Sequence, residues 1–348
     1  MSDKRVRIGD ISKELGLSSS TVSRALSGKG YVAAEVKARV VEAARRMGYV
    51  PDLTARNLRR RSSTQVGLVV SSLLDPFYAQ LATGFQSVAR RRGYEVVLII
   101  DGADPGEEKA AVESLLAMGV GGIAMTPVSD EALARVEDYG ICTLQLDRSV
   151  SSRYSLIGGD NRAGGVIATE HLLSSGHRDI AVLVDHDRWT TGFERIAGWR
   201  DAFTRAGLTP PEDLCVKLGD TREDIETALR TVVPRLVQQG VTAIFAANSQ
   251  VAQLLYTALQ DQGLSVPDDI SLVAYDDANW TEMVRPAISV ITQHVDMLGQ
   301  TAADQLIGMI EAPKADAPSV GAPVSRFLVQ PTLVERDSVR AITPDGSA

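Results

Sequence analysis

Residues 17–26 read LSSSTVSRAL, and this stretch predicts a short helix with a polar leading edge. Ser18 can cap the helix, because a serine hydroxyl accepts a hydrogen bond from an N–H group at a helix N-terminus. Val22 and Ala25 share one apolar face, and the hydroxyl residues lie largely on others. An apolar helical pattern precedes the stretch and is broken by Gly16. Two helices joined by such a turn form a helix-turn-helix, although any short amphipathic helix pair would fit these residues alone.

The polar edge of this helix has residue types that a DNA groove accepts. Small hydroxyl side chains let the backbone come close to base edges in the major groove. An arginine can form a forked pair of hydrogen bonds with guanine, which reads that base specifically. The candidate DNA contacts in this part of the chain are Ser19, Ser20, Thr21, Ser23, Arg24 and Tyr31.

The residues that follow carry a family resemblance. Apolar side chains at helical spacing predict a third helix over 36–47, closed by Gly48. Residues 52–58 then read DLTARNL and precede three arginines. In this combination and spacing, the chain resembles the lactose-repressor (LacI/GalR) family of bacterial transcription regulators. The matching residues are Ser18, Thr21, Val22, Ser23, Arg24, Ala25, Leu26, Ala43, Gly48, Tyr49, Pro51, Ala55, Arg56 and Leu58.

The resemblance implies a helix-turn-helix domain at 1–50 and a hinge helix with its linker at 51–65. A helix as short as the DLTARNL segment is unstable alone in water, so we expect it to fold when two copies pack together on DNA. Ala55, Arg56 and Leu58 are then the expected minor-groove contacts, with Leu58 as an apolar wedge between base pairs. The expected partner is double-stranded DNA with a pseudo-palindromic operator, bound by a homodimer.

Charge is distributed unevenly along the 348 residues. Residues 1–65 carry 14 Lys and Arg against 6 Asp and Glu, and the remainder carries 22 against 38, so the two parts have net charges of +8 and −16. This asymmetry is expected when only the basic segment touches a polyanion. No apolar run is long enough to span a membrane and the first residues are polar, so we expect no membrane association and a cytoplasmic, nucleoid-associated protein.

From Gln65 onward, strand-like apolar runs alternate with amphipathic helices. The predicted strands are 66–70, 95–100, 121–125, 141–146, 180–184, 214–218, 243–246 and 271–275, and the predicted helices are 79–92, 107–118, 131–139, 163–174, 195–206, 224–239 and 250–262. This alternation predicts an α/β fold of doubly wound parallel sheets. No Gly-x-Gly-x-x-Gly motif or Walker loop follows the first strand, which argues against a nucleotide-dependent enzyme.

By the same resemblance, the body at 66–338 has the two-lobed fold of periplasmic binding proteins. The first lobe is expected at 66–159 and 294–322, the second at 160–293 and 323–338, and a disordered tail at 339–348. The tail lacks the leucine heptads that build tetramers in the lactose repressor, so a dimer is expected.

Polar residues after the predicted strands mark a ligand site, because open α/β sheets bind ligands at strand carboxyl ends. Asp147 with Arg148, Asn248 and Asp276 follow three different strands. Arg195 matches the cleft arginine of the family, and its planar fork could hold two hydroxyls or a carboxylate. Together these residues predict a cleft for a small-molecule effector.

Aromatic residues could form a wall of this cleft. Phe77 and Tyr78 match the aromatic-bearing loop that the family has after its first strand. Trp189 and Trp280 lie in predicted loops, where either could stack on a sugar, although Trp280 could equally pack at an interface. Arg195 and Asp276 are shared by sugar- and purine-responsive relatives, so they do not choose between these ligands. We expect a sugar effector and keep a nucleobase or a phosphorylated sugar as alternatives.

Catalytic machinery is not evident in the sequence. No pair of the four histidines has metal-ligand spacing, and no nucleophile elbow is present. We therefore expect no enzyme activity, no metal and no cofactor. The sequence predicts an effector-controlled DNA-binding transcription regulator, most simply a repressor. A solute-binding protein would share the body but would have no use for residues 1–61.

Overall fold

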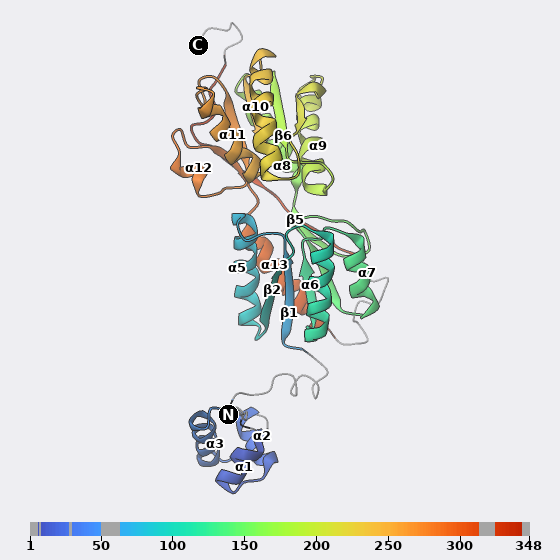
Figure 1. Cartoon of the computed structure of the whole chain (residues 1–348), viewed down its shortest axis with the longest axis vertical. Coiled ribbons are helices and arrows are strands. Elements are labelled where there is room, and N and C mark those ends of the chain that lie inside the picture. Colours follow the sequence, from blue (N-terminus) through green and yellow to red (C-terminus); the bar gives the residue numbers. More distant parts are fainter. Residues whose placement is uncertain (1–5, 7, 28–29, 50–62, 313–323, 343–348) are drawn as a thin grey trace. The chain divides into compact units, whose positions relative to one another are not determined.

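The computed structural model describes residues 6, 8–27, 30–49, 63–312 and 324–342 (Figure 1). The chain divides into two compact units, Met1–Ser62 and Ser63–Ala348. Each unit has its own hydrophobic core. Within the described ranges, no helix is long and apolar enough to cross a membrane.

The N-terminal unit consists of three short helices, α1 (Ile8–Leu15), α2 (Ser19–Ser27) and α3 (Ala34–Arg46). Ile11, Val22 and Val40, one from each helix, meet in its core and have no exposed surface. A glycine with φ of +65° ends α1, a backbone conformation that only glycine adopts readily. Ser18 caps α2 as predicted, since its hydroxyl accepts a hydrogen bond from the Thr21 N–H at 3.1 Å. The predicted helix-turn-helix is confirmed.

The C-terminal unit contains two lobes, each built on a six-stranded sheet. The first sheet has the order β11-β5-β4-β3-β1-β2, with all neighbouring strands parallel. Its strands are β1 (Gln65–Val70), β2 (Glu95–Ile100), β3 (Gly122–Met125), β4 (Cys142–Leu146), β5 (Leu156–Gly159) and β11 (Arg326–Val329). Helices α5 (Pro76–Arg91) and α13 (Val295–Glu311) cover one face, and α6 (Pro105–Met118) and α7 (Asp130–Asp138) cover the other (Figure 1).

The second sheet has the order β12-β10-β9-β8-β6-β7, and only β12 runs antiparallel to its neighbour. Its strands are β6 (Ile180–Val184), β7 (Cys215–Lys217), β8 (Ala243–Ala246), β9 (Ser271–Tyr275), β10 (Ser289–Thr292) and β12 (Thr332–Val334). Helices α8 (Asn161–Ser174) and α9 (Thr190–Arg205) cover one face, and α10 (Arg222–Gln238) and α11 (Ser249–Asp261) cover the other. A 3-10 turn, η1 (Glu212–Leu214), precedes β7, and a short helix, α12 (Trp280–Met283), follows β9.

Coverage on both faces explains why the strands are apolar throughout. Every residue of β6 and β9 is buried, as expected for parallel strands between two helix layers. In the first lobe, Gly84 and Gly299 allow α5 and α13 to touch, because a Cβ added to either would lie 2.3 or 2.1 Å from a carbonyl oxygen of the other helix. The predicted doubly wound α/β fold is confirmed.

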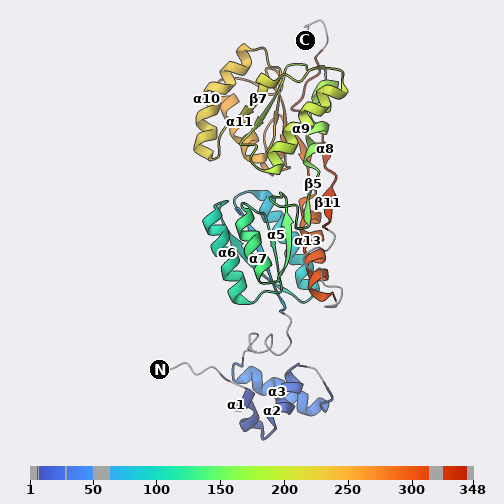
Figure 2. The ribbon, with the colours of Figure 1, turned by 90° about the vertical axis from the view of Figure 1, so that its right-hand side faces the viewer.

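The chain passes between the lobes three times, between β5 and α8, between β10 and α13, and between β11 and β12 (Figure 2). The third passage lies after Val329, because β11 pairs with β5 in the first lobe, with Phe327 opposite Ile157. The predicted boundary between 322 and 323 is therefore too early. Its error comes from β11, a four-residue strand that the sequence pattern did not reveal.

Residues 339–342 are ordered along the second lobe, so the predicted tail does not begin at 339. The Arg340 N–H donates to the Ser271 hydroxyl at 3.1 Å, and the Ile342 N–H donates to the Ser175 carbonyl at 2.7 Å. His177 is fully buried and bonds the Arg340 carbonyl at 3.1 Å. These contacts are between distant parts of the chain, which a composition argument cannot detect. Residues 343–348 lie outside the described residues.

Candidate DNA-binding surface and ligand cleft

The outer face of α2 carries most of the predicted DNA contacts. Ser19, Ser20 and Arg24 are exposed, and Thr21 and Ser23 are half-buried. The Arg24 Nε donates to the Ser20 carbonyl at 3.3 Å, so the arginine lies along its own helix. The opposite face of α2 is buried against α1 and α3. The core therefore orients α2 with its polar side chains toward solvent.

Gly30, the first residue described after α2, lies beside this face. A Cβ added to Gly30 would lie 3.3 Å from the Arg24 Cδ, so the loop backbone packs on the arginine. Tyr31 comes next and is 91% exposed. The three predicted minor-groove residues, Ala55, Arg56 and Leu58, lie outside the described residues.

A cavity of about 750 Å³ lies between the two lobes of the C-terminal unit. Its walls include residues that follow strands of both sheets, namely β1, β2 and β4 of the first lobe and β6, β8 and β9 of the second. The volume is that of a small-molecule site. All eight residues predicted for the effector cleft line this cavity: Phe77, Tyr78, Asp147, Arg148, Trp189, Arg195, Asn248 and Asp276.

Arg195 projects from α9 into the base of the cavity and is 5% exposed. Its Nε donates to the Asn161 Oδ1 at 2.8 Å, and its Nη1 donates to the Ala247 carbonyl at 2.6 Å. The guanidinium lies over the Tyr275 ring, 3.6 Å from the centroid. These contacts fix the plane of the guanidinium, which is the condition for forked recognition of a ligand.

Asp147 and Asp276 occupy equivalent places in the two lobes. Each directly follows a strand, β4 or β9, and each has the left-handed backbone, with φ of 63° and 71°. Burial raises the pKa of both carboxyls to about 6, against the opposing effect of nearby arginines. The Asp276 Oδ1 also accepts a hydrogen bond from the Gln293 Nε2 at 2.7 Å. The strained backbone directs two enclosed carboxyls into one cavity.

Asp75 adds a third carboxyl to the cavity wall, and sequence analysis missed it. Its Oδ1 accepts from the Phe77 N–H at 2.9 Å and caps α5, while burial raises the pKa of its carboxyl. An Asp before Pro76 signals a helix cap rather than a ligand site, so the sequence pattern concealed this position.

The lobes touch at Arg148, which is 1% exposed. Its Nε and Nη2 donate to first-lobe groups, including the Pro127 carbonyl at 2.9 Å and the Ser71 hydroxyl. Its guanidinium lies 3.7 Å from the centroid of the Trp189 ring in the second lobe. Beside it, the Ser149 N–H donates to the Thr190 hydroxyl at 3.1 Å. Arg148 therefore lines the cavity mainly as a contact between lobes.

The other predicted cleft residues have mixed roles. Phe77 is buried in the first-lobe core, and the Tyr78 ring packs edge-on against it at 5.1 Å. The Asn248 Oδ1 accepts from the Val251 N–H at 2.8 Å and caps α11. Phe77 and Asn248 therefore also serve local structure, which does not prevent contact with a ligand.

Trp280 does not line the cavity. Its ring packs 5.9 Å from that of Tyr256, against the apolar core of the second lobe. Trp280 therefore does not have the predicted place in the cleft wall, and the structure gives it a packing role inside the second lobe rather than the alternative role at an interface. The reason is the short helix α12, which begins at this residue and turns its ring toward α11.

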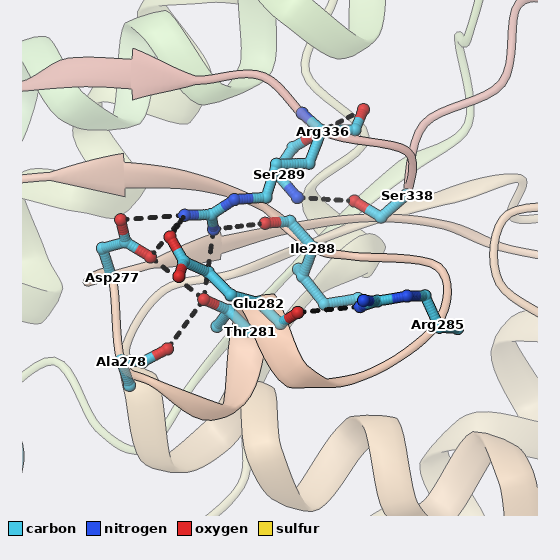
Figure 3. A network of polar contacts seen from close by, with 9 residues as sticks. All are labelled: Asp277, Ala278, Thr281, Glu282, Arg285, Ile288, Ser289, Arg336 and Ser338. Carbon is cyan, nitrogen blue, oxygen red and sulfur yellow. Dashed lines mark hydrogen bonds and ion pairs between the residues drawn. The ribbon is translucent and has the colours of Figure 1, made fainter.

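The loop that begins at Asp276 is anchored within the second lobe by Arg336 (Figure 3). The Arg336 Nη2 lies 2.9 and 3.0 Å from the two carboxylate oxygens of Asp277 and 2.8 Å from the Glu282 Oε1. Its Nη1 donates to the Ile288 carbonyl at 2.8 Å. The segment after β12 therefore clamps the residue next to Asp276. Sequence analysis missed Arg336, because its partners lie 48 to 59 residues earlier in the chain, beyond the reach of any local pattern.

Two family profiles match this chain. The profile described as "Bacterial regulatory proteins, lacI family" matches residues 7–52, and "Periplasmic binding protein-like domain" matches residues 169–339. The HTH-type transcriptional repressor PurR of Pectobacterium carotovorum subsp. carotovorum is 30% identical over 337 residues, covering 95% of this chain and 96% of that protein. The ribose operon repressor of Haemophilus influenzae is 24% identical over 344 residues, covering 96% and 98%.

Solved structures with the same fold include regulators bound to DNA or to sugars. The lac repressor dimer bound to operator and an anti-inducer matches with a TM-score of 0.82 at 28% identity, covering 97% of this chain and 100% of that chain. The transcriptional regulator CelR in complex with cellobiose matches with a TM-score of 0.71 at 26% identity, covering 96% and 100%.

Proposed function

Since the chain belongs to the lacI family of bacterial regulatory proteins, we propose that it is a repressor that binds a pseudo-palindromic operator as a homodimer and responds to a sugar in the interlobe cleft. The single observation that carries the proposal is the cleft itself. The oriented Arg195 and the carboxyls of Asp75, Asp147 and Asp276 face a cavity of small-molecule size, which Asp185 and Asp220 also line. Its action on DNA places the protein in the cytoplasm, and we expect no catalytic activity.

A sugar suits this cleft better than an anion does. Asp75, Asp147 and Asp276 present acceptors for ligand hydroxyls, and Arg195 presents paired donors. The five aspartates of the lining would repel a phosphate group, and they outnumber its four arginines, Arg148, Arg188, Arg195 and Arg222. The cellobiose complex of CelR, at 26% identity, supports a sugar. A nucleobase remains the second candidate because of the similarity to PurR repressors.

A thermal-shift screen tests the effector class. The probes are D-ribose, cellobiose, guanine and ribose 5-phosphate, each added to the full chain. A ligand at 100 times its Kd stabilises the folded state by about 2.7 kcal/mol, so a true effector raises the melting temperature clearly. We expect a sugar to give the largest shift. If only guanine raised the melting temperature, the effector would be a nucleobase and not a sugar.

Operator recognition rests on α2. Ser19, Ser20 and Arg24 form the proposed major-groove surface, with Thr21, Ser23 and Tyr31 beside it. The proposed minor-groove contacts Ala55, Arg56 and Leu58 rest on the family resemblance. Selection of DNA from a randomised pool should yield a two-fold symmetric site. Recovery of only asymmetric sequences, or of no preferred sequence, would contradict the proposal.

A homodimer is supported by the exposed edge of the first lobe. β2 ends the first sheet, and its Leu98 and Ile100 are 38% and 49% exposed on one side of the strand. Leu74, after β1, is 96% exposed. Apolar groups and an open strand edge favour burial against a partner, and the lac repressor neighbour was solved as a dimer. Sedimentation should give a dimer for the wild type and a monomer after Leu98→Asp with Ile100→Asp.

A further inference from the structure

The three passages between the lobes are hydrogen-bonded to one another. The Asp160 N–H donates to the Val329 carbonyl at 2.9 Å, and the Gln330 Nε2 donates to the Asp160 Oδ2 at 2.9 Å, which joins the first passage to the third. A hydrogen bond of 3.3 Å between Thr332 and His294 joins the third to the second. Because of these hydrogen bonds, a movement of one passage should be accompanied by a movement of the other two.

Two charged residues of the cleft are bonded to these passages. Arg195 donates to the side chain of Asn161, the first residue of α8 after the first passage. Asp276 accepts from Gln293, which lies in the second passage between β10 and α13. Asn161 and Gln293 are 7% and 1% exposed. Both links are enclosed, where hydrogen bonds to charged groups are strong.

The cleft ends of both links are held in the second lobe. Arg195 is fixed by the Ala247 carbonyl and the Tyr275 ring. Asp276 is followed by Asp277, which Arg336 clamps (Figure 3). A ligand that binds Arg195 and Asp276 therefore leaves the second lobe itself little changed. The groups that can adjust are the hydrogen-bonded partners of these residues at the passages, Asn161 and Gln293.

Gln293 is also where two passages meet. A Cβ added to Gly159, at the end of β5, would lie 2.2 Å from the Gln293 Oε1, so the glutamine packs directly on the first passage. This Oε1 is buried and accepts no hydrogen bond from the described residues. The next residue, His294, has φ of 53°, which lies in the left-handed region. Two features here are unfavourable, a buried acceptor without a hydrogen bond and a residue with a strained backbone. A rearrangement of this segment could relieve both.

We propose that Asn161 and Gln293 are the positioning residues through which a ligand in the cleft sets the arrangement of the two lobes. The inference rests on the proposed function, because it assigns a route between the effector and operator binding. Occupation of the cleft changes the hydrogen bonds that Arg195 and Asp276 make. Asn161 and Gln293 then shift two passages together, and the third follows through its own bonds.

The test measures coupling rather than affinity. The probe is the member of the D-ribose, cellobiose, guanine and ribose 5-phosphate panel that stabilises the wild type most. Operator Kd is measured by fluorescence anisotropy without the probe and at saturation. We expect the wild type to change by about 5- to 150-fold, the usual range of allosteric coupling. Gln293→Met and Asn161→Leu should reduce the change to less than twofold, even though the probe still saturates the cleft.

Two control variants separate this role from a structural one. Asn161→Asp keeps the acceptor for Arg195 and loses only the Nδ2 donor to the Gly159 carbonyl at 3.2 Å, so it should keep most of the wild-type coupling. Gln239→Met removes an exposed glutamine that bonds the Asp213 side chain within the second lobe, lies in none of the three passages and does not line the cavity, and it should also keep the coupling. A purely structural defect would lower the melting temperature and the probe affinity without changing coupling at saturation.

The outcomes distinguish the two proposals. A wild type that binds no selected operator, or responds to no probe, would overturn the proposed function and this inference with it. A wild type that responds, with coupling unchanged in Gln293→Met and Asn161→Leu, would overturn only this inference. If Gln293→Met fails to fold or to bind the probe, the Asn161 variants decide, and equal coupling in Asn161→Leu and Asn161→Asp rejects the role.

Discussion

The α2 surface takes its polar residues from one short stretch, 19–24, where they are exposed or half-buried. The cleft takes Asp147, Arg195 and Asp276 from three distant parts of the chain and encloses them. Exposed polar groups stay hydrated and do not lower the stability of the fold, whereas enclosed charges lose their hydration and lower stability unless they are well paired. Substitutions on α2 should therefore change binding alone, and substitutions in the cleft should change both binding and stability.

The largest effect is expected for Arg195→Ala. The substitution removes the paired donors and leaves the Asn161 and Ala247 oxygens buried without their partner. Truncating one member of a buried, charged hydrogen-bonded pair costs about 2–5 kcal/mol, so affinity for the sugar should fall at least about 30-fold in calorimetry. Arg200→Ala is the matched control, because Arg200 lies on the same helix and pairs outward with Glu212 at 2.7 Å. Equal sugar affinity in both variants would place the ligand elsewhere.

Arg24→Ala should give the next largest effect, on operator binding. Loss of a forked contact to guanine costs about 1–3 kcal/mol and relaxes the preference at one position of each half-site. The melting temperature should not change, since Arg24 is exposed. Competition with single-base operator variants measures the preference. A loss that is uniform over all sequences would make Arg24 a phosphate contact.

A smaller effect on stability is expected from Asp276→Asn. The carboxyl has a pKa of about 6 in the folded protein and an ordinary value of 3.8, so folding favours its protonated form. Its contribution to stability is full below about pH 4 and is lost as pH rises through 6. The variant should therefore melt higher than the wild type at pH 7, by about 2–4 °C for each kcal/mol regained, yet bind the sugar more weakly. An unchanged pH profile of melting would show that Asp276 is not held at this pKa.

The smallest effect is expected for Glu42→Gln on α3. Glu42 and Arg45 form an ion pair of 3.4 Å with side chains 67% and 80% exposed. Exposed pairs of this kind contribute little, because water and salt screen them. Melting temperature and operator affinity should both match the wild type within error. A clear loss of stability would contradict the expectation that exposed polar residues of the N-terminal unit contribute little to folding.

The same contrast explains what sequence analysis could predict. Ser18, Val22 and Ala25 act within two turns of one helix, so their spacing alone predicted α2 and its cap. Strand ends placed Asp147 and Asp276 in the cleft, because parallel strands bring their carboxyl ends to one edge. Local patterns carry this kind of information reliably when each residue's partner is near in sequence or fixed by sheet topology.

Features that depend on distant pairing were missed. Asp75 read as a helix cap, and Gln293 and Arg336 act through partners 17 and 59 residues away in the chain. The strands β5, β10, β11 and β12 were not predicted; β11 and β12 lie at sheet edges, where β11 buries one residue and β12 buries none, so neither has the two-sided burial of a central strand. Their absence from the prediction moved the third passage between the lobes too early in the chain, before the pairing of β11 with β5.

Control of operator binding by the cleft is tested most directly by one anisotropy titration. Operator affinity is measured for the wild type and Arg195→Ala, each without and with increasing concentrations of the sugar that stabilises the wild type most. We predict that the sugar changes wild-type operator affinity by about 5- to 150-fold, and that Arg195→Ala needs at least about 30 times more sugar for a comparable response. An equal response of the two proteins at the same sugar concentrations, or no response of a wild type that binds the sugar, would contradict the account.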